Sequence, residues 1–201
     1  MIAPLPKGTT LEGRYCINDV LGQGGFGITY RATDTRIHCN VCIKELCMKT
    51  HMQRAEGTTL MQLRTGADTG EIEAQKQQMI AEADTLANLR EPAVVRVTDR
   101  FEANNTTYMV MELLRGETLG KWLHGPMEEA SVVALLQPIM KTLVHIHRQG
   151  VLHRDLAPDN LMLNDDHSAL TLIDFGAVGR AGTKQNTAKL SFSPIEQYQA
   201  E

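Results

Sequence analysis

The sequence predicts an α+β protein, with strands concentrated in the first half and helices in the second. Two β-branched runs flank a glycine cluster within residues 15–35, and residues 93–114 alternate as a hairpin with its turn at 103–105. Apolar side chains recur at helical spacing over 132–146. With 42% hydrophobic and 22% charged residues, the composition is that of an ordinary globular protein.

The elements can be predicted in chain order. A third strand covers 38–46, and a helix covers 71–90, where apolar residues recur in steps of three and four. Between them, residues 48–70 have weak periodicity, so we expect an irregular insertion with a short helix. The segment 112–119 links the two halves of the chain.

The second half begins with a helix over 131–149, which Gly150 is expected to end. Pro138 lies inside this helix and removes a backbone donor, which predicts a kink or a late start. Short strands are expected around 151–152, 161–163 and 170–173.

Charge and hydropathy exclude several function classes. The net charge is −4 without any basic block, so neither nucleic acid nor an anionic membrane is an expected partner. The apolar runs are too short for a transmembrane span, and the N-terminus lacks a secretory signal pattern. We therefore expect a cytoplasmic protein with reduced cysteines.

The glycine cluster GQGGFG at 22–27 has the spacing G-x-G-x-x-G. A strand-like run follows it, whereas a dinucleotide-binding turn would open a helix there. The glycines are therefore expected in a hairpin whose backbone N–H groups could approach a polyphosphate. A plain glycine hairpin is the alternative.

Lys44 lies inside an apolar strand, where an unpaired ammonium group is costly to bury. It needs an anion, and a nucleotide phosphate together with a carboxylate would supply two. Glu82 is the candidate carboxylate because it lies at the edge of the apolar stripe of its helix. In the alternative, Glu82 is solvated and the Lys44 amine extends to water.

Three polar groups in the second half could support phosphate chemistry. Asp155, in HRDLAPDN, would act as a base or orient an attacking hydroxyl. Asn160 and Asp174 offer hard oxygen ligands of the kind that Mg²⁺ prefers. Arg154 could receive an anion such as a phosphorylated side chain.

Taken together, seven motifs resemble the Hanks-type serine/threonine protein kinases of bacteria. In order they are GQGGFG, VCIKE, EADTLANL, YMVMELL, HRDLAPDN, IDFG and SPIEQY, spread over residues 11–201. The resemblance implies a protein-kinase-like two-lobe fold. Residues 11–114 would form an antiparallel sheet with one main helix. Residues 115–201 would form an incomplete helical lobe holding the catalytic loop, the metal-binding loop and the activation segment.

The resemblance also implies ATP with Mg²⁺ or Mn²⁺ as cofactors, and serine or threonine hydroxyls of proteins as acceptors. Asp155, Lys44 and Glu82 would be catalytic, and Asn160 and Asp174 would bind the metal ion. The nucleotide would be held by Gly22, Gly24, Gly25, Gly27, Thr29, Cys42, Lys44, Met111, Glu112, Leu114 and Met162.

Regulation would fall on the activation segment, with Thr183, Thr187 and Ser191 as phosphorylation sites and Arg154 as the receiver of the added charge. Many serine/threonine kinases carry a lysine where this sequence has Ala157. Arg180, Lys184 or Lys189 could supply the missing cation.

Other functions remain open at this stage. The domain could be a nucleotide-binding pseudokinase or scaffold, or an inactive fragment of a longer kinase, since kinases of this type continue for several helices beyond the position of Glu201. A dimer or a partner chain would then cover the exposed lower lobe. Small-molecule phosphotransfer ranks last, because those enzymes carry HGD where this sequence has HRD.

Overall fold

The computed structural model describes residues 2–175, together with Gly179 and Arg180. The chain divides into two compact units. The first contains Met1–Ala87 and Arg96–Leu113, and the second contains Asn88–Val95 and Leu114–Glu201. Residues 88–95, which the sequence places in the first lobe, thus group with the second unit.

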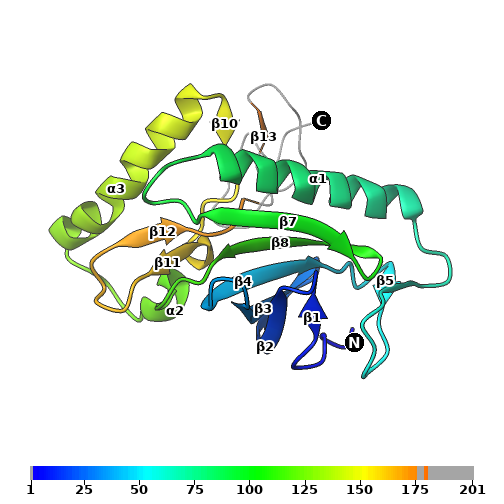
Figure 1. Ribbon diagram of the computed structural model, residues 1–201. Coiled ribbons are helices and arrows are strands. Elements are labelled where there is room, and N and C mark those ends of the chain that lie inside the picture. Colours follow the sequence, from blue (N-terminus) through cyan, green and yellow to red (C-terminus); the bar gives the residue numbers. More distant parts are fainter. Residues whose placement is uncertain (1, 176–178, 181–201) are drawn as a thin grey trace. The chain divides into compact units, whose positions relative to one another are not determined.

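A six-stranded antiparallel sheet dominates the first unit (Figure 1). The strand order is β1-β2-β3-β4-β8-β7. The expected strands and the expected hairpin are confirmed, with the turn at Asn104 and Asn105 in the left-handed backbone region. The bounds are β1 Thr10–Leu11, β2 Tyr15–Gln23, β3 Gly27–Asp34, β4 Cys39–Leu46, β7 Val97–Ala103 and β8 Thr106–Glu112.

Helix α1, Thr69–Asn88, runs alongside this sheet on the side of β7 (Figure 1). It confirms the helix expected over 71–90. Its buried stripe includes Met79, Ala83 and Leu86, as the helical spacing predicts. Asp84 accepts hydrogen bonds from Arg100 of β7, at 2.6 Å to Nε, which ties the exposed side of the helix to the sheet.

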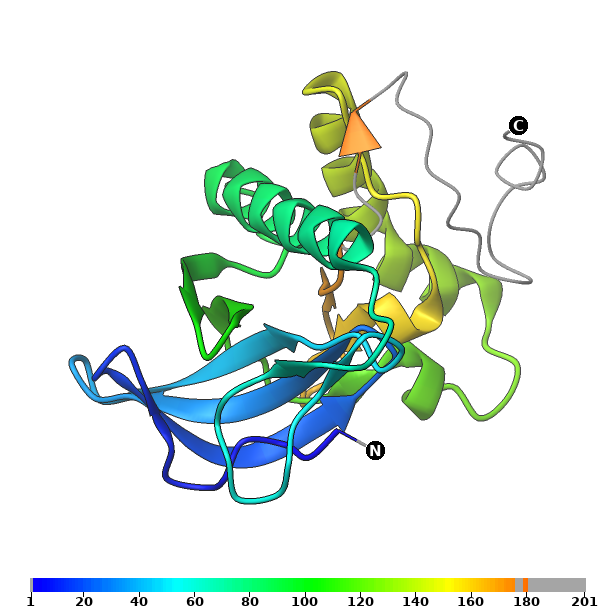
Figure 2. The same ribbon diagram turned by 90° about the vertical axis from the view of Figure 1, so that its right-hand side faces the viewer.

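The insertion between β4 and α1 differs from the prediction. It forms a short hairpin of β5, Met52–Gln53, and β6, Gln62–Leu63, and residues 48–68 contain no helix, so the expected short helix is wrong. Gly57 and Gly66 adopt positive φ angles, which break any helical repeat. The hairpin lies beside the N-terminal residues in both views (Figures 1 and 2).

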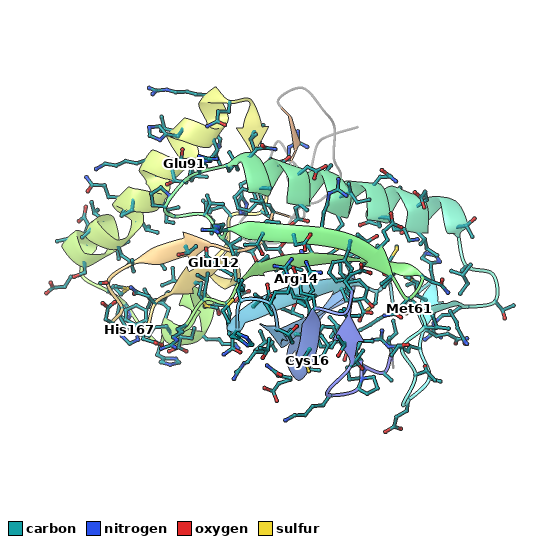
Figure 3. All side chains as sticks on the ribbon, in the orientation of Figure 1. Arg14, Cys16, Met61, Glu91, Glu112 and His167 are labelled. Atoms are coloured by element: carbon teal, nitrogen blue, oxygen red, sulfur yellow. The ribbon has the colours of Figure 1, made fainter. Side chains whose placement is uncertain are left out.

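Aromatic and charged side chains fill the inside of the curved sheet. The Phe101 ring of β7 lies 5.7 Å from the Tyr15 ring of β2 and 5.1 Å from the Tyr108 ring. Arg14, labelled in Figure 3, donates to the buried Asp34 at 2.6 Å and to Asp99 of β7 at 3.2 Å. These contacts join strands that are far apart in the sheet order.

The second unit contains helix α2, Leu119–Trp122, helix α3, Glu129–Arg148, and the 3-10 turn η1, Pro158–Asn160. Its strands form one sheet ordered β12-β11-β9 and one pair, β10-β13. The expected short strands are confirmed. The strand bounds are β9 Glu117–Thr118, β10 Val151–Leu152, β11 Leu161–Leu163, β12 Leu170–Leu172 and β13 Gly179–Arg180.

Helix α3 corrects one expectation and confirms another. It begins at Glu129 and continues past Pro138, so the late start is wrong. Burial of Ile139 and Ile146 against the rest of the unit outweighs the single backbone donor that proline removes. Gly150, with φ 76°, ends the helix and donates from its N–H to the His147 carbonyl, as expected of a C′ glycine.

Within the described residues, α3 is also the one helix long and apolar enough to cross a membrane by length and composition alone. This is weak evidence for a span, because helices of soluble proteins pass the same test.

Candidate functional site

The four glycines of the cluster lie where β2 turns into β3. A Cβ atom on Gly27 would stand 2.8 Å from the Glu45 carbonyl oxygen, so only glycine fits this approach to β4. Around Gly22 and Gly25, by contrast, nothing lies within 4 Å of the added atom. The turn is therefore constrained at its β3 end, and its remaining glycines expose their backbone.

Lys44 and Glu82 are brought together within the first unit. The ammonium Nζ of Lys44 lies 3.6 Å from Glu82 Oε1. The Glu82 side chain is 4% exposed and that of Lys44 is 26% exposed, so the carboxylate is buried and the lysine side chain is partly exposed. The solvated alternative for Glu82 is excluded, and the ammonium could meet a second anion.

One face of the sheet carries the other predicted nucleotide contacts of this unit. Thr29 is the cross-strand partner of Lys44, and Cys42 is the partner of Met111. Since Cys42 and Lys44 are two residues apart on β4, their side chains point to the same face. Burial raises the pKa of the Cys42 thiol to about 11, against the opposing charge of Lys44, so this thiol stays protonated near neutral pH.

The last residue of β8, Glu112, and Leu114, two residues later, are the last two predicted contacts of this part of the chain. Glu112 donates from its N–H to the Arg96 carbonyl oxygen at 3.0 Å, and its carboxylate accepts from the Arg96 N–H at 2.8 Å. The N–H of Glu112 is therefore already used. Leu114, the other predicted contact, is half-buried and begins the 114–201 part of the second unit.

In the second unit, the structure places Asp155 and Asn160 in direct contact. Asn160 donates from Nδ2 to the backbone carbonyl of Asp155 at 2.8 Å and to its Oδ2 at 2.7 Å. Asn160 is buried, and its backbone carbonyl oxygen accepts a hydrogen bond from the N–H of Ile173, the residue before Asp174. The Asp155 carboxylate, the Asn160 amide and the turn at Asp174 are thus held as one cluster.

His153 is a residue of this cluster to which the sequence assigned no role. Its buried ring lies 4.5 Å from that of Phe175, and its Nδ1 accepts from the Asp155 N–H at 3.3 Å. Burial lowers the pKa of His153, while the charges of Asp174 and Asp155 act in the opposite direction. The neutral imidazole therefore supports both acidic turns. Its place two residues before Asp155, within HRDLAPDN, was the available signal.

Other predicted residues occupy more peripheral positions in this unit. Met162 on β11 is half-buried and pairs with Thr118 and Thr171. Arg154 has a left-handed backbone, with φ 62°, and Ala157 is 2% exposed. The predicted phosphorylation sites and most of the candidate replacement cations lie outside the described residues, namely Thr183, Thr187, Ser191, Lys184 and Lys189.

The predicted metal ligands, Asn160 and Asp174, can be compared with the kinds of oxygen ligand that Mg²⁺ binds in proteins. Among the described residues, no three His, Cys, Asp or Glu side chains gather as a metal site. Mg²⁺ commonly binds through one or two protein oxygens and completes its shell with substrate phosphates and water. The oxygens of Asn160 and Asp174 fit an ion held together with a nucleotide, rather than a metal held by protein alone.

Comparisons with known proteins address the family to which this chain belongs. The family model described as "Protein kinase domain" matches residues 15–200. Serine/threonine-protein kinase B of Synechocystis is 34% identical over 173 residues, covering 84% of this chain and 27% of that protein. PknL of Mycobacterium tuberculosis is 32% identical over 170 residues, covering 84% of this chain and 38% of that protein.

A solved structure, "PpkA-294 apo form", aligns with a TM-score of 0.78 at 32% identity and covers 86% of this chain. The alignment spans 62% of that chain, and this sequence is much shorter than its curated relatives. The kinase-like fold is confirmed, and with it the general use of ATP and a divalent metal ion by the family. The chain belongs to the protein kinase domain family.

Proposed function

We propose that this domain transfers the γ-phosphoryl group of ATP to serine or threonine hydroxyls of protein substrates. The Lys44–Glu82 ion pair is the observation that carries the proposal. The Glu82 side chain is 4% exposed, and the Lys44 ammonium group 3.6 Å away compensates its buried charge. In this proposal, the ammonium group held by Glu82 binds the α- and β-phosphates of ATP.

The remaining nucleotide contacts would come from the backbone of the glycine-rich turn, from the sheet face that carries Thr29, Cys42 and Met111, and from Glu112, Leu114 and Met162. Backbone N–H groups of the glycine-rich turn would cover the phosphates. Because the N–H of Glu112 already donates to Arg96, its carbonyl oxygen is the group left for the adenine edge. The hydrophobic and hinge contacts to adenine would come from Thr29, Cys42, Met111, Leu114 and Met162.

Asp155 would orient the substrate hydroxyl and accept its proton. The bond from Asn160 Nδ2 fixes one carboxylate oxygen of Asp155, so the other oxygen can face the hydroxyl. That same bond turns the amide so that Oδ1 of Asn160 is the atom available to a metal ion, with Asp174 as the second ligand. When bound, Mg²⁺ would neutralise charge on the phosphates, and Mn²⁺ is the alternative ion.

Three further predictions remain proposals. Thr183, Thr187 and Ser191 would be phosphorylated, with Arg154 receiving the charge. The four cysteines are free thiols, which is consistent with a reducing cytoplasmic compartment. A dimer or partner chain remains a proposal without an observed contact.

One observation favours a second function, a nucleotide-binding scaffold without turnover. Ala157 occupies the position where many serine/threonine kinases have a lysine, and at 2% exposure it is packed. A missing charge-assisted contact to the transferring phosphate costs about 2–4 kcal/mol of transition-state stabilisation unless another cation replaces it.

Radiolabelled ATP with a generic protein substrate tests the two functions, in parallel with binding of a fluorescent ATP analogue. We expect Asp155→Asn to keep nucleotide binding and to lose transfer by roughly 10²–10⁴-fold. Lys44→Met should weaken binding and abolish transfer. Mg²⁺ and Mn²⁺ should be compared in each assay.

Asp165→Asn is the matched control, since Asp165 is an exposed carboxylate in the β11–β12 turn. Its transfer rate should equal that of the unmodified chain. Nucleotide binding without transfer by the unmodified chain would favour the scaffold, and transfer that survives Asp155→Asn would contradict the proposed role of that residue.

A further inference from the structure

The segment that follows β4, residues 47–54, contacts several separate parts of the first unit. Its first contact is with the glycine-rich turn. The N–H of Cys47 donates to the Phe26 carbonyl at 2.9 Å, and the N–H of Lys49 donates to the Gly25 carbonyl at 3.2 Å. Two backbone carbonyls at the tip of that turn are therefore held by this segment.

Its second contact is with the beginning of α1, through His51. The N–H of Asp68 donates to His51 Nδ1 at 3.1 Å, so the ring proton lies on Nε2. Nε2 in turn lies 2.8 Å from Glu71 Oε2, a charge-assisted hydrogen bond. Asp68 also accepts from the Glu71 N–H at 3.0 Å, in the manner of an N-cap. His51 thus holds the capped first turn of α1.

Its third contact is with the sheet interior, through Arg54. Both side chains of the Arg54–Glu45 pair are fully buried, with Nη1 2.6 Å from Oε1. Arg54 Nε donates to the Ala3 carbonyl at 2.8 Å, and Gln23, beside the glycine-rich turn, donates to the Ile2 carbonyl at 3.0 Å. The far end of the segment is therefore fixed to β4 next to Lys44, and to the N-terminal residues.

We propose that residues 47–54 form a brace that sets the glycine-rich turn and helix α1 together, with His51 and Arg54 as its positioning residues. The helix from Glu71 to Glu82 is about 16 Å long and behaves as a rigid rod, so a shift of its first turn moves the partner of Lys44. The link to nucleotide binding rests on the proposed function, whereas the mechanical coupling does not.

The test compares His51→Ala, His51→Gln and Gln53→Ala by amide hydrogen exchange and by affinity for a fluorescent ATP analogue. Loss of one charge-assisted bond should speed exchange at the Glu71 amide and, through the brace, at Cys47 and Lys49, each by about 5-fold. Nucleotide affinity should fall by about the same factor. His51→Gln keeps a donor for Glu71. It should therefore retain most of the amide protection and most of the nucleotide affinity of the unmodified chain.

Gln53 is exposed within the same segment, so Gln53→Ala should match the unmodified chain in both measurements. Faster exchange confined to Glu71, with Cys47 and Lys49 unchanged, would overturn the coupling. The coupling would also be overturned if His51→Gln exchanged as fast as His51→Ala, or if Gln53→Ala sped exchange as much as His51→Ala does. If the unmodified chain binds no nucleotide, the proposed function fails and the exchange data still decide whether the brace exists.

Discussion

At the scale of single residues, the most demanding feature of the first unit is the Glu45 carboxylate. It is fully buried and accepts hydrogen bonds from Arg54, Tyr30 and Tyr108, with Tyr108 Oη at 2.7 Å from Oε1. Burial, reinforced by the Glu45 charge, raises the pKa values of both tyrosines well above the ordinary range, so both hydroxyls remain donors. A buried charge is tolerated here because every neighbouring polar group serves it.

Removing Arg54 should therefore be severe. Arg54→Ala leaves the Glu45 charge buried without its cation, and we expect the free energy of unfolding to fall by about 3–5 kcal/mol. Chemical denaturation followed by circular dichroism would measure it, with Arg36→Ala, an exposed arginine, as the neutral control. The double variant Glu45→Leu/Arg54→Met should recover much of the loss, because the penalty comes from the unpaired charge. An equally unstable double variant would contradict this explanation.

At the scale of elements, two glycines of the glycine-rich turn differ in how much room they have. Gly27 is required by its close approach to β4, whereas Gly25 has open space around it. Gly27→Ala would bring a Cβ to 2.8 Å from the Glu45 carbonyl and push β3 away from β4. Such overpacking should cost about 1–3 kcal/mol of stability. Gly25→Ala has open space around the new methyl group and serves as the matched control. Thermal unfolding measures both, and equal melting temperatures would show that the strands adjust freely.

In the first unit, the elements predicted from sequence were those with a strong repeat. The strands β2, β3, β4, β7 and β8 and helix α1 have seven or more residues each, whereas β1, β5 and β6 have two residues each and leave no periodic signal. The brace was missed for the same reason. Its contacts are backbone bonds and a buried arginine, and a sequence does not reveal which carboxylate an arginine in an irregular segment will meet.

The candidate site was predictable where neighbours in a motif are also neighbours in space. Asp155 and Asn160 are joined through one short turn, and Glu82 was selected from the helical projection of α1. His153 was missed because its importance lies in burial, and burial of a single polar residue follows from packing of the whole unit. The late start predicted from Pro138 was wrong because local propensity was weighed without the apolar contacts of α3, and the alternative of a kink stays a prediction.

At the scale of the whole molecule, the chain passes between its two units three times, and one crossing has a clear anchor. After α1 the chain enters the second unit, where the Val95 N–H donates to the Leu172 carbonyl at 2.8 Å and the Leu172 N–H donates to the Ala93 carbonyl. The helix that carries Glu82 is thus followed, within a few residues, by a segment paired to β12, the strand that leads to Asp174. Two backbone bonds thus hold the segment after α1 to β12 within the second unit.

The two units should respond differently to acid, because their sensitive groups titrate in different ranges. In the second unit, the pKa of the buried His153 is lowered from 6.5, so the unfolded state binds more protons once the pH falls below that value. Stability of this unit should therefore decline from about pH 6.5 down to the lowered folded pKa, and no further below it. In the first unit, hydrogen bonds from Arg14 lower the pKa of Asp34 from 3.8, so its contribution persists above pH 3.8 and is lost only as the pH falls through the folded value.

Trp122, the single tryptophan of the chain, lies in α2 of the second unit, and its fluorescence reports on that unit alone. Urea midpoints from Trp122 emission should drop between pH 7 and pH 5, whereas exchange protection of β4 amides in the first unit should hold until the pH approaches 4. His153→Gln removes the titrating ring. The urea midpoint from Trp122 emission should then no longer depend on pH between 7 and 5, even if the protein is less stable overall. A midpoint that stays level for the unmodified chain, or one that still falls in His153→Gln, would show that burial of this imidazole does not govern the acid response.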